Sequence, residues 1–349
     1  MRDRKKGVKS VILSAMFLLL LIVVTYYLLF KRFDIKEILA IIGDADMLYI
    51  AIGFAMIFIY LACYCFFTKT LLASRGYFIG IYRGFVYAAA DFYFSAVTPS
   101  ATGGQPFVIY YMNKDGVPVS EGFLSTFLHT TVYKIVLLTL NLFSVVIFWN
   151  VWSDSGWAFI ALWFLGLVIT LGIILLTLLS VLKRDAVFRF GNAIIKFLGN
   201  FNIIKDTVKV SEKFAETVDD YQLAAKELKG KRKLLFKLFV IVFIQRLAYF
   251  SVAFIIYCSL GNTGYGYFYF LAIQAFIALA IDSLPLPGGM GANELAIIMM
   301  YKATFGPERA AGAMLLIRFV NYYFGLILSS AVTISYHIYK SFKSKKVVK

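Results

Sequence analysis

The chain has 349 residues, of which 61% are hydrophobic and 15% are charged, and its formal net charge is +16. An ordinary soluble domain has about 45–50% apolar and about 25% charged residues, so this composition excludes that class. The short alternating segments typical of an outer-membrane barrel are absent from the sequence. The sequence therefore predicts an all-α polytopic membrane protein.

The excess basic residues lie at the ends of apolar runs, where Lys and Arg set membrane topology and contact anionic headgroups. We therefore expect a lipid bilayer and no nucleic acid as partner. Cys63, Cys65 and Cys258 lie inside apolar segments without disulfide or metal spacing, and His129 and His337 are far apart in the sequence. No metal and no cofactor are expected.

The first predicted element follows a basic amino terminus. Its apolar run, Val8–Phe30, is too long for a signal-peptide core, so we expect a retained transmembrane helix. Further runs reach the length of about 20 residues that a membrane-spanning helix needs. These additional predicted spans are Leu48–Phe67, Phe123–Trp149, Trp157–Leu182, Leu234–Cys258 and Ala313–Tyr339, which makes about six full spans.

Composition changes sharply after the fourth span. The segment 183–233 is polar, and its apolar residues recur at helical spacing, which favours two amphipathic helices at the membrane interface or in the cytosol. This linker divides the chain into an N-terminal membrane half, residues 1–182, and a C-terminal membrane half, residues 234–349.

Two stretches of broken helix lie between full spans. Residues 85–112 contain two apolar arms around TPSATGGQP, and residues 267–303 contain two arms around LPLPGGMGANE. Proline and glycine interrupt a helix, and interrupted backbone at membrane depth requires protein or a water-filled cavity around it. We therefore predict two re-entrant hairpins. For the second stretch, a loop outside the membrane is the alternative.

The distribution of Lys and Arg predicts the orientation. The start of the chain, the 69–83 connection, the linker and the tail are basic, whereas 153–156 and 261–266 contain neither residue. By the positive-inside rule both termini lie in the cytoplasm, although the basic residues at 31–36 then lie outside. The first hairpin enters from inside and the second from outside. This inverted repeat is typical of transporters with a site near the membrane midplane.

Charged side chains within the apolar spans indicate a candidate site. Arg246 and Lys134 lie near the middle of their spans, and such charges are costly in lipid and usually functional. Free N–H groups at the start of a half-helix suit a phosphate, and glycine lets the backbone approach it closely. The residues predicted to bind and translocate a lipid are Pro99, Gly103, Gly104, Gln105, Lys134, Arg246, Asp282, Pro287, Gly288, Gly289, Glu294 and Arg318.

Three acids are the expected counter-ions of these cations. Asp282 and Glu294, with Asp91, either balance the cations or contact an amine on a lipid headgroup. Two alternatives stay open: the charges fix helix register as buried ion pairs, and the hairpins only plug the fold. His129 is expected to be a hydrogen-bonded core residue. No catalytic residue is predicted.

The paired motifs resemble the membrane domain of the lysylphosphatidylglycerol synthase and multiple peptide resistance factor family. The matching residues are TPSATGGQP with Tyr110-Tyr111 and Lys114, then LPLPGGMGANE, then Arg318 with Asn321-Tyr322-Tyr323. The resemblance covers essentially the whole chain and implies a lipid-flipping membrane domain. Full-length members also carry a soluble domain that aminoacylates phosphatidylglycerol from charged tRNA, for which we expect no room here. Gln105 stands where many members have Glu.

The sequence thus predicts a lipid translocase of the bacterial inner membrane. Its substrate is expected to be an anionic or aminoacylated phospholipid, or a related lipid phosphate. An enzyme of lipid aminoacylation and a membrane partner of a separate synthase are the alternatives. Whether the chain forms a homo-oligomer stays open.

Overall fold

The computed structural model describes residues 43, 45–98, 103–200, 206–228, 230–282, 284, 289, 291–306 and 309–346. The predicted first span, Val8–Phe30, and the predicted hairpin-tip residues Pro99, Pro287 and Gly288 lie outside these ranges. Within the described ranges all regular structure is helical, which confirms the all-α class.

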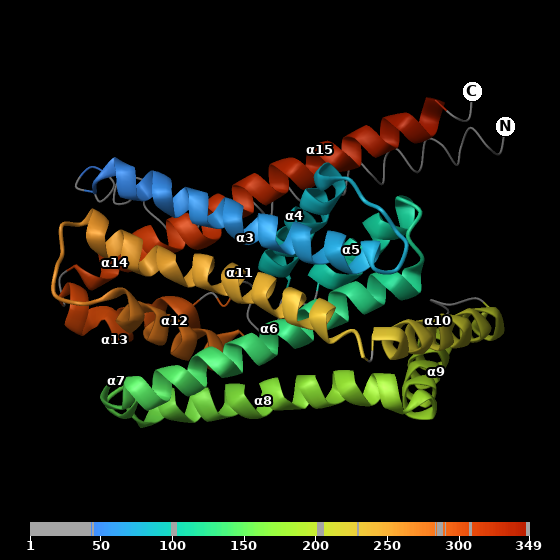
Figure 1. Ribbon diagram of the computed structural model, residues 1–349, viewed down its shortest axis with the longest axis horizontal. Coiled ribbons are helices and arrows are strands. Elements are labelled where there is room, and N and C mark those ends of the chain that lie inside the picture. The colour runs from blue at the N-terminus through green and yellow to red at the C-terminus, as the bar shows by residue number, and fades with distance from the viewer. Residues whose placement is uncertain are drawn as a thin grey trace.

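The described part of the chain has 5 helices that are long and apolar enough to cross a membrane. They lie along the long axis of the molecule in Figure 1, and every predicted span after the first corresponds to one of them. Four are α3 (Met47–Ala73), α6 (Val119–Ile147), α8 (Trp157–Leu182) and α11 (Arg232–Ser259), and the fifth is the last span, Ala310–Lys340.

Two ends of this bundle are distinguished by their contacts. At one end, where the short helix α7 (Trp149–Ser153) also lies in Figure 1, the N–H of Asp46 before α3 donates to the Ser259 carbonyl at the end of α11, at 2.9 Å. At the other end, Arg75 after α3 pairs with Glu121 on α6 and with Glu227. We call the first the α7 end and the second the basic end.

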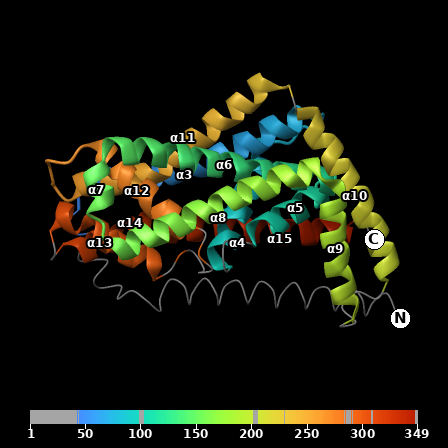
Figure 2. The same cartoon turned by 90° about the horizontal axis from the view of Figure 1, so that it is seen from below.

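The predicted linker helices lie at the basic end. They are α9 (Arg184–Asn200) and α10 (Thr207–Leu228), which lie side by side across that end of the bundle in Figure 2. Buried Tyr221 and Leu228 attach α10 to the core. The described residues between 183 and 230 form two helices, α9 and α10.

The first hairpin enters the bundle from the basic end (Figure 1) and consists of α4 (Ile81–Val97) and α5 (Gly104–Lys114). Its arms are held together near the tip, where the rings of Phe94 and Phe107 stack with centroids 3.5 Å apart. An added Cβ at Gly104 would lie 2.7 Å from the Asp91 carbonyl oxygen, so the close approach of the arms requires glycine there.

The second hairpin enters from the α7 end (Figure 1) and consists of α12 (Tyr267–Ile281) and α13 (Ala292–Phe305). Every residue from Phe270 to Ile281 is buried, so α12 lies inside the bundle and not in a loop outside it. The return helix begins after Gly291, whose backbone N–H donates to the Glu294 carboxylate at 2.5 Å. A carboxylate in the first turn satisfies a free N–H and is favoured by the helix dipole.

The last span is not a regular helix. It comprises α14 (Ala310–Arg318), a π-helical segment η3 (Phe319–Phe324) and α15 (Gly325–Lys346). Periodicity predicts one continuous span and cannot locate such a segment. The wider turn occurs directly after Arg318, where π-helical turns often mark functional positions.

Candidate functional site

A cavity of about 540 Å³ lies between the two hairpins. It is lined by α4 and α5 from the basic end, by α12 and α13 from the α7 end, and by side chains of α3, α6, α8, α11 and the last span. The predicted site residues that reach it are Gln105, Lys134, Arg246, Asp282, Gly289 and Arg318.

Arg246 on α11 is the cation of this cavity with an unsatisfied donor. Its side chain is 8% exposed, and its guanidinium carbon lies 3.8 Å from the ring centroid of Tyr133 and 5.1 Å from that of Tyr60. One terminal nitrogen donates to the Tyr60 hydroxyl at 3.3 Å. Among the described residues, the buried Nε has no hydrogen-bond partner.

Two aromatic rings stabilise the charge of Arg246, and the carboxylate of Asp91 interacts with it without forming a salt bridge among the described residues. Aromatic rings attract a cation through their negative faces, but Tyr60 and Tyr133 carry no formal charge. A buried donor left without an acceptor costs about 1–3 kcal/mol. An anion that accepts a hydrogen bond from Arg246 removes this cost, so the geometry favours an anionic ligand.

Tyr133 connects this cation to an acid. Its hydroxyl donates a hydrogen bond to the carboxylate of Asp282, which follows α12. The neighbouring Lys134 is 5% exposed and lies with its Nζ 5.2 Å from the Tyr133 ring centroid. The arrangement brings two cations and one carboxylate to the same side of the cavity.

Arg318 differs from Arg246 because it has a carboxylate partner. Its Nε donates to Glu294 Oε1 at 3.1 Å, and its guanidinium carbon lies 4.3 Å from the Tyr322 ring centroid. The side chain of Arg318 is 2% exposed and that of Glu294 13%. Glu294 therefore balances Arg318 while it caps α13, and this contact joins the second hairpin to the last span.

The first hairpin contributes an acid and a neutral amide. Asp91 on α4 lines the cavity and accepts a hydrogen bond from Tyr64. Gln105 on α5 donates through Nε2 to Thr130 Oγ1 at 2.7 Å. At the start of this return helix, the side chain facing the cavity is thus uncharged.

The glycines predicted for the site have different roles. Gly289 lines the cavity with φ of +65°, and an added Cβ would lie 3.2 Å from Ile281. Gly103 and Gly104 are not among the lining residues; they lie where α5 meets α4. Their small size therefore serves the packing of the first hairpin.

Sequence reasoning missed the aromatic and polar residues around Arg246. Tyr60 and Tyr64 are one helical turn apart on α3, and the cavity-lining residues of α6 also recur at helical spacing. The helical spacing of these residues could have predicted a polar face on each helix that lines the cavity. His129, expected to be hydrogen-bonded, lies with a ring nitrogen 3.0 Å from Gln245 Oε1 and also lines the cavity. The lining residues of α6 are Thr126, His129, Thr130, Tyr133 and Lys134.

One wall of the cavity is apolar. Ile169 and Ile173 come from α8, and Ile277 and Ile281 come from α12. Farther along, α8 exposes large aliphatic side chains on its outer surface, as a lipid-facing helix does. The cavity thus combines a charged region with an apolar wall. Within the described residues, no group of His, Cys, Asp or Glu could hold a metal ion.

The fold and the cavity define a polytopic helical membrane protein with ionisable groups in the centre of its bundle. The chain belongs to the family of the lysylphosphatidylglycerol synthase TM region, which matches residues 10–329. It is also similar to a UPF0104 membrane protein of Archaeoglobus fulgidus, with 22% identity over 325 residues that cover 90% of this chain and 94% of that protein. The family expected from the paired motifs is confirmed.

Proposed function

We propose that this protein translocates an anionic or aminoacylated phospholipid, or a related lipid phosphate, across the membrane. The observation that carries the proposal is Arg246, a cation in the cavity whose buried Nε has no hydrogen-bond partner among the described residues. A lipid phosphate supplies acceptor oxygens and a negative charge, and arginine binds phosphate with a planar fork of donors.

The apolar wall supports a lipid over a small soluble anion. A phospholipid needs a polar site for its headgroup and an apolar path for its acyl chains. The charged groups around Arg246 suit the first, and Ile169 and Ile173 on the membrane-facing helix α8 suit the second. A soluble anion would gain nothing from these isoleucines.

The residues have separate proposed roles. Arg246 and Lys134 hold the phosphate, and Arg318 keeps Glu294 neutralised at the tip of the second hairpin. Asp91 and Asp282 balance the cations or accept hydrogen bonds from an amine on the headgroup. The hairpins, which enter from opposite ends (Figure 1), provide two routes to one site.

The proposed orientation follows from charge. The basic end carries Arg75, Arg83, Lys114, Lys183 and Lys340, and we place it in the cytoplasm by the positive-inside rule. The α7 end then faces outside, and the protein lies in the plasma membrane. The three-part division at residues 182 and 234 fits this arrangement, because the linker helices lie at the proposed cytoplasmic face.

A vesicle assay with the purified full-length protein tests the proposal. A phospholipid labelled on its headgroup is placed in both leaflets, and an impermeant quencher reports how fast the inner leaflet becomes accessible. We expect faster exchange in wild-type vesicles than in protein-free vesicles, and slow exchange with Arg246→Gln. Wild-type vesicles that exchange lipid no faster than protein-free ones contradict translocation.

The same vesicles separate the two alternatives. Lysyl transfer to phosphatidylglycerol from charged tRNA identifies an enzyme of aminoacylation. If neither exchange nor transfer occurs, adding candidate synthases tests a role as a membrane partner. Both alternatives involve lysylphosphatidylglycerol synthesis, and the family to which the chain belongs is that of a synthase transmembrane region.

A further inference from the structure

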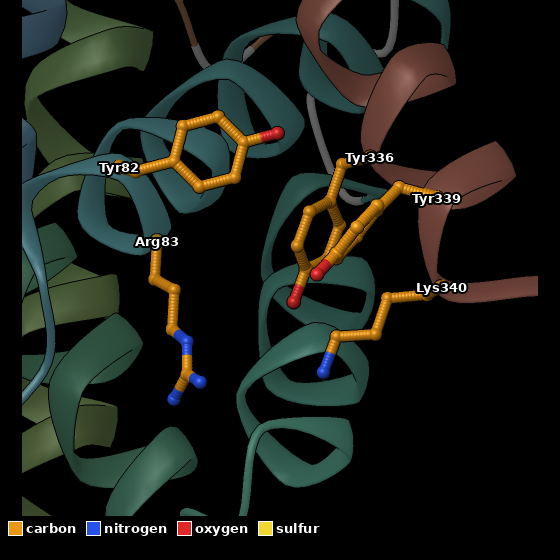
Figure 3. Close-up of a pocket in the computed structure, with 5 residues that line it drawn as sticks. All are labelled: Tyr82, Arg83, Tyr336, Tyr339 and Lys340. Atoms are coloured by element: carbon orange, nitrogen blue, oxygen red, sulfur yellow. The ribbon is translucent and has the colours of Figure 1, made fainter. Parts of the chain in front are cut away.

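A second pocket, of about 310 Å³, lies at the basic end between the start of α4 and the end of α15. None of its lining residues lines the central cavity. Figure 3 shows Arg83 and Lys340 on opposite sides, with the hydroxyls of Tyr336 and Tyr339 pointing into the space between them. The pocket is therefore separate from the central cavity, and it lies between the first hairpin and the last span.

One wall of this pocket is fixed by a buried acid. Asp115, after α5, has a fully buried side chain that pairs with Lys340. It also accepts hydrogen bonds from Tyr336, at 2.5 Å and 2.6 Å to its two oxygens, and from Tyr87 at 2.7 Å. These contacts hold Lys340 and Tyr336 in place before any ligand arrives.

The opposite wall carries an exposed cation. Arg83 lies in the first turn of α4, and in the described part of the chain it forms no salt bridge. Asp115 balances one of the two pocket cations, Arg83 and Lys340, which leaves one positive charge. The pocket thus attracts an anion.

The position of the pocket relative to the membrane surface indicates what kind of anion reaches it. The last apolar span ends at Lys340, and tyrosines beside the pocket are exposed, Tyr82 by 60% and Tyr339 by 55%. Exposed tyrosine at the end of a span lies at the level of lipid headgroups. We propose that this pocket binds the phosphate of an anionic lipid headgroup at the membrane surface, independently of the central cavity.

Such a lipid contacts α4 and α15 together. Arg83 supplies a fork of donors to the phosphate oxygens, and Lys340 supplies a point charge from the other side. The phenol groups of Tyr82 and Tyr339 add hydroxyl donors and apolar ring surface beside the glycerol region. Bound lipid therefore strengthens the attachment of the first hairpin to the last span.

Lipid binding to the purified full-length protein, measured by native mass spectrometry, tests this site. An Arg246→Gln background weakens the central cavity, so phosphatidylglycerol that still binds reports the surface pocket. We expect Arg83→Gln in this background to weaken binding about tenfold, the effect of one lost hydrogen bond between charged groups. Lys237→Gln is the matched control, because Lys237 is an exposed cation near the basic end that does not line the pocket.

A second variant and a second ligand complete the test of this pocket. If Arg83→Gln does not purify as a folded protein, Arg83→Lys keeps the charge but loses the planar fork, and it is expected to bind several-fold more weakly. Inorganic phosphate is titrated as the second ligand and should not displace the lipid at the same concentration. Equal binding by Arg83→Gln and Lys237→Gln overturns the site, and displacement by inorganic phosphate at equal concentration assigns it to a free ion.

The result is independent of translocation. Loss of binding in Arg83→Gln supports the surface site even if vesicles containing wild-type protein exchange no lipid. Conversely, full lipid exchange combined with unchanged binding by Arg83→Gln removes the surface site and leaves the central one in place.

Discussion

The two hairpins are built alike, but each forms its charged contact with the last span at a different depth. The first forms this contact at its base, where Asp115 pairs with Lys340 and accepts a hydrogen bond from Tyr336. The second forms it at the start of its return helix, where Glu294 contacts Arg318. In both cases a buried or nearly buried carboxylate of the hairpin binds a cation of the last span.

This difference decides which charges remain for a ligand. At the second hairpin, the carboxylate of Glu294 and the guanidinium of Arg318 balance each other. At the first, the anchoring acid Asp115 lies at the base and is not among the cavity-lining residues, and the hairpin contributes the acid Asp91 and the neutral amide of Gln105 to the cavity. Arg246, on α11 between the hairpins, keeps an unsatisfied donor among the described residues. The hairpins therefore shape the cavity, and the full span α11 supplies the cation that is proposed to bind an anion.

The largest expected effect comes from breaking the attachment of the second hairpin. Glu294→Ala leaves Arg318 as a buried charge without this partner, and removing one partner of a buried pair costs about 3–5 kcal/mol. The thermal unfolding temperature in detergent should fall strongly. The exposed acid Glu212 on α10 provides the control, as Glu212→Ala.

A double-mutant cycle shows whether that loss belongs to the pair. Glu294→Ala combined with Arg318→Met removes both charges, so the combined loss should be smaller than the sum of the single losses. Additive losses would contradict a direct pairing and leave Glu294 as a helix cap only.

The next largest effect concerns Arg246, the residue proposed to bind the anion. Arg246→Gln should lower the rate of lipid exchange in vesicles about 10–100-fold, since a hydrogen bond to a charged group contributes about 1.5–3 kcal/mol. Membrane insertion should be normal, because removing a charge from the helix centre favours insertion. Lys237→Gln controls for general loss of positive charge. An exchange rate equal to that of the control would remove Arg246 from the site.

Acid should release the base of the first hairpin. Burial alone would raise the pKa of Asp115, but hydrogen bonds from Lys340, Tyr336 and Tyr87 outweigh it and lower the pKa below its usual value. The ionised form is therefore bound more strongly in the folded state. Its contribution is complete above the ordinary pKa of Asp and is lost as the pH falls through the lowered value.

The measurement is the unfolding temperature against pH for wild type and Asp115→Asn. At neutral pH the variant should be less stable by about 1.5 kcal/mol, the lower range for a hydrogen bond to a charged group. The two curves should converge in acid. A gap that stays constant down to strongly acidic pH would mean that the ionised carboxylate is not what attaches the hairpin.

A smaller effect is expected from a backbone substitution at the tip of the second hairpin. Gly289→Val puts a branched side chain at φ +65° and close to Ile281, so the strain should cost about 1–2 kcal/mol of stability. It also narrows the cavity, and lipid exchange should fall while the protein still reaches the membrane. Gly306→Val, at φ +78° with no atom within 4 Å of the added Cβ, separates strain from blockage.

The opposite orientation of the hairpins is tested with little effect on stability. Asn113→Cys, near the base of the first hairpin, and Thr263→Cys, before the second, are exposed positions. In a background without Cys63, Cys65 and Cys258, an impermeant thiol reagent should label them from opposite sides of the membrane. Labelling of both from one side would overturn the inverted arrangement.

The sequence by itself determined the helices and their interruptions. Hydrophobic runs located α8 at Trp157–Leu182, and helical periodicity located the two linker helices, because both signals depend on neighbouring residues only. Proline and glycine located the breaks in both hairpins for the same reason. The sequence also located each charged residue within an apolar span, but not its partner.

Only the tertiary structure decided which of these charges are balanced. Arg318 and Glu294 are close in the chain, but Arg246 meets Tyr60 and Tyr133 from other helices, and Asp115 meets Lys340 from the far end of the sequence. Such contacts depend on how distant helices pack, and helical spacing carries no information about partners on another helix. Packing likewise made Gly104 a contact between two hairpin arms and left the buried Nε of Arg246 without an acceptor among the described residues.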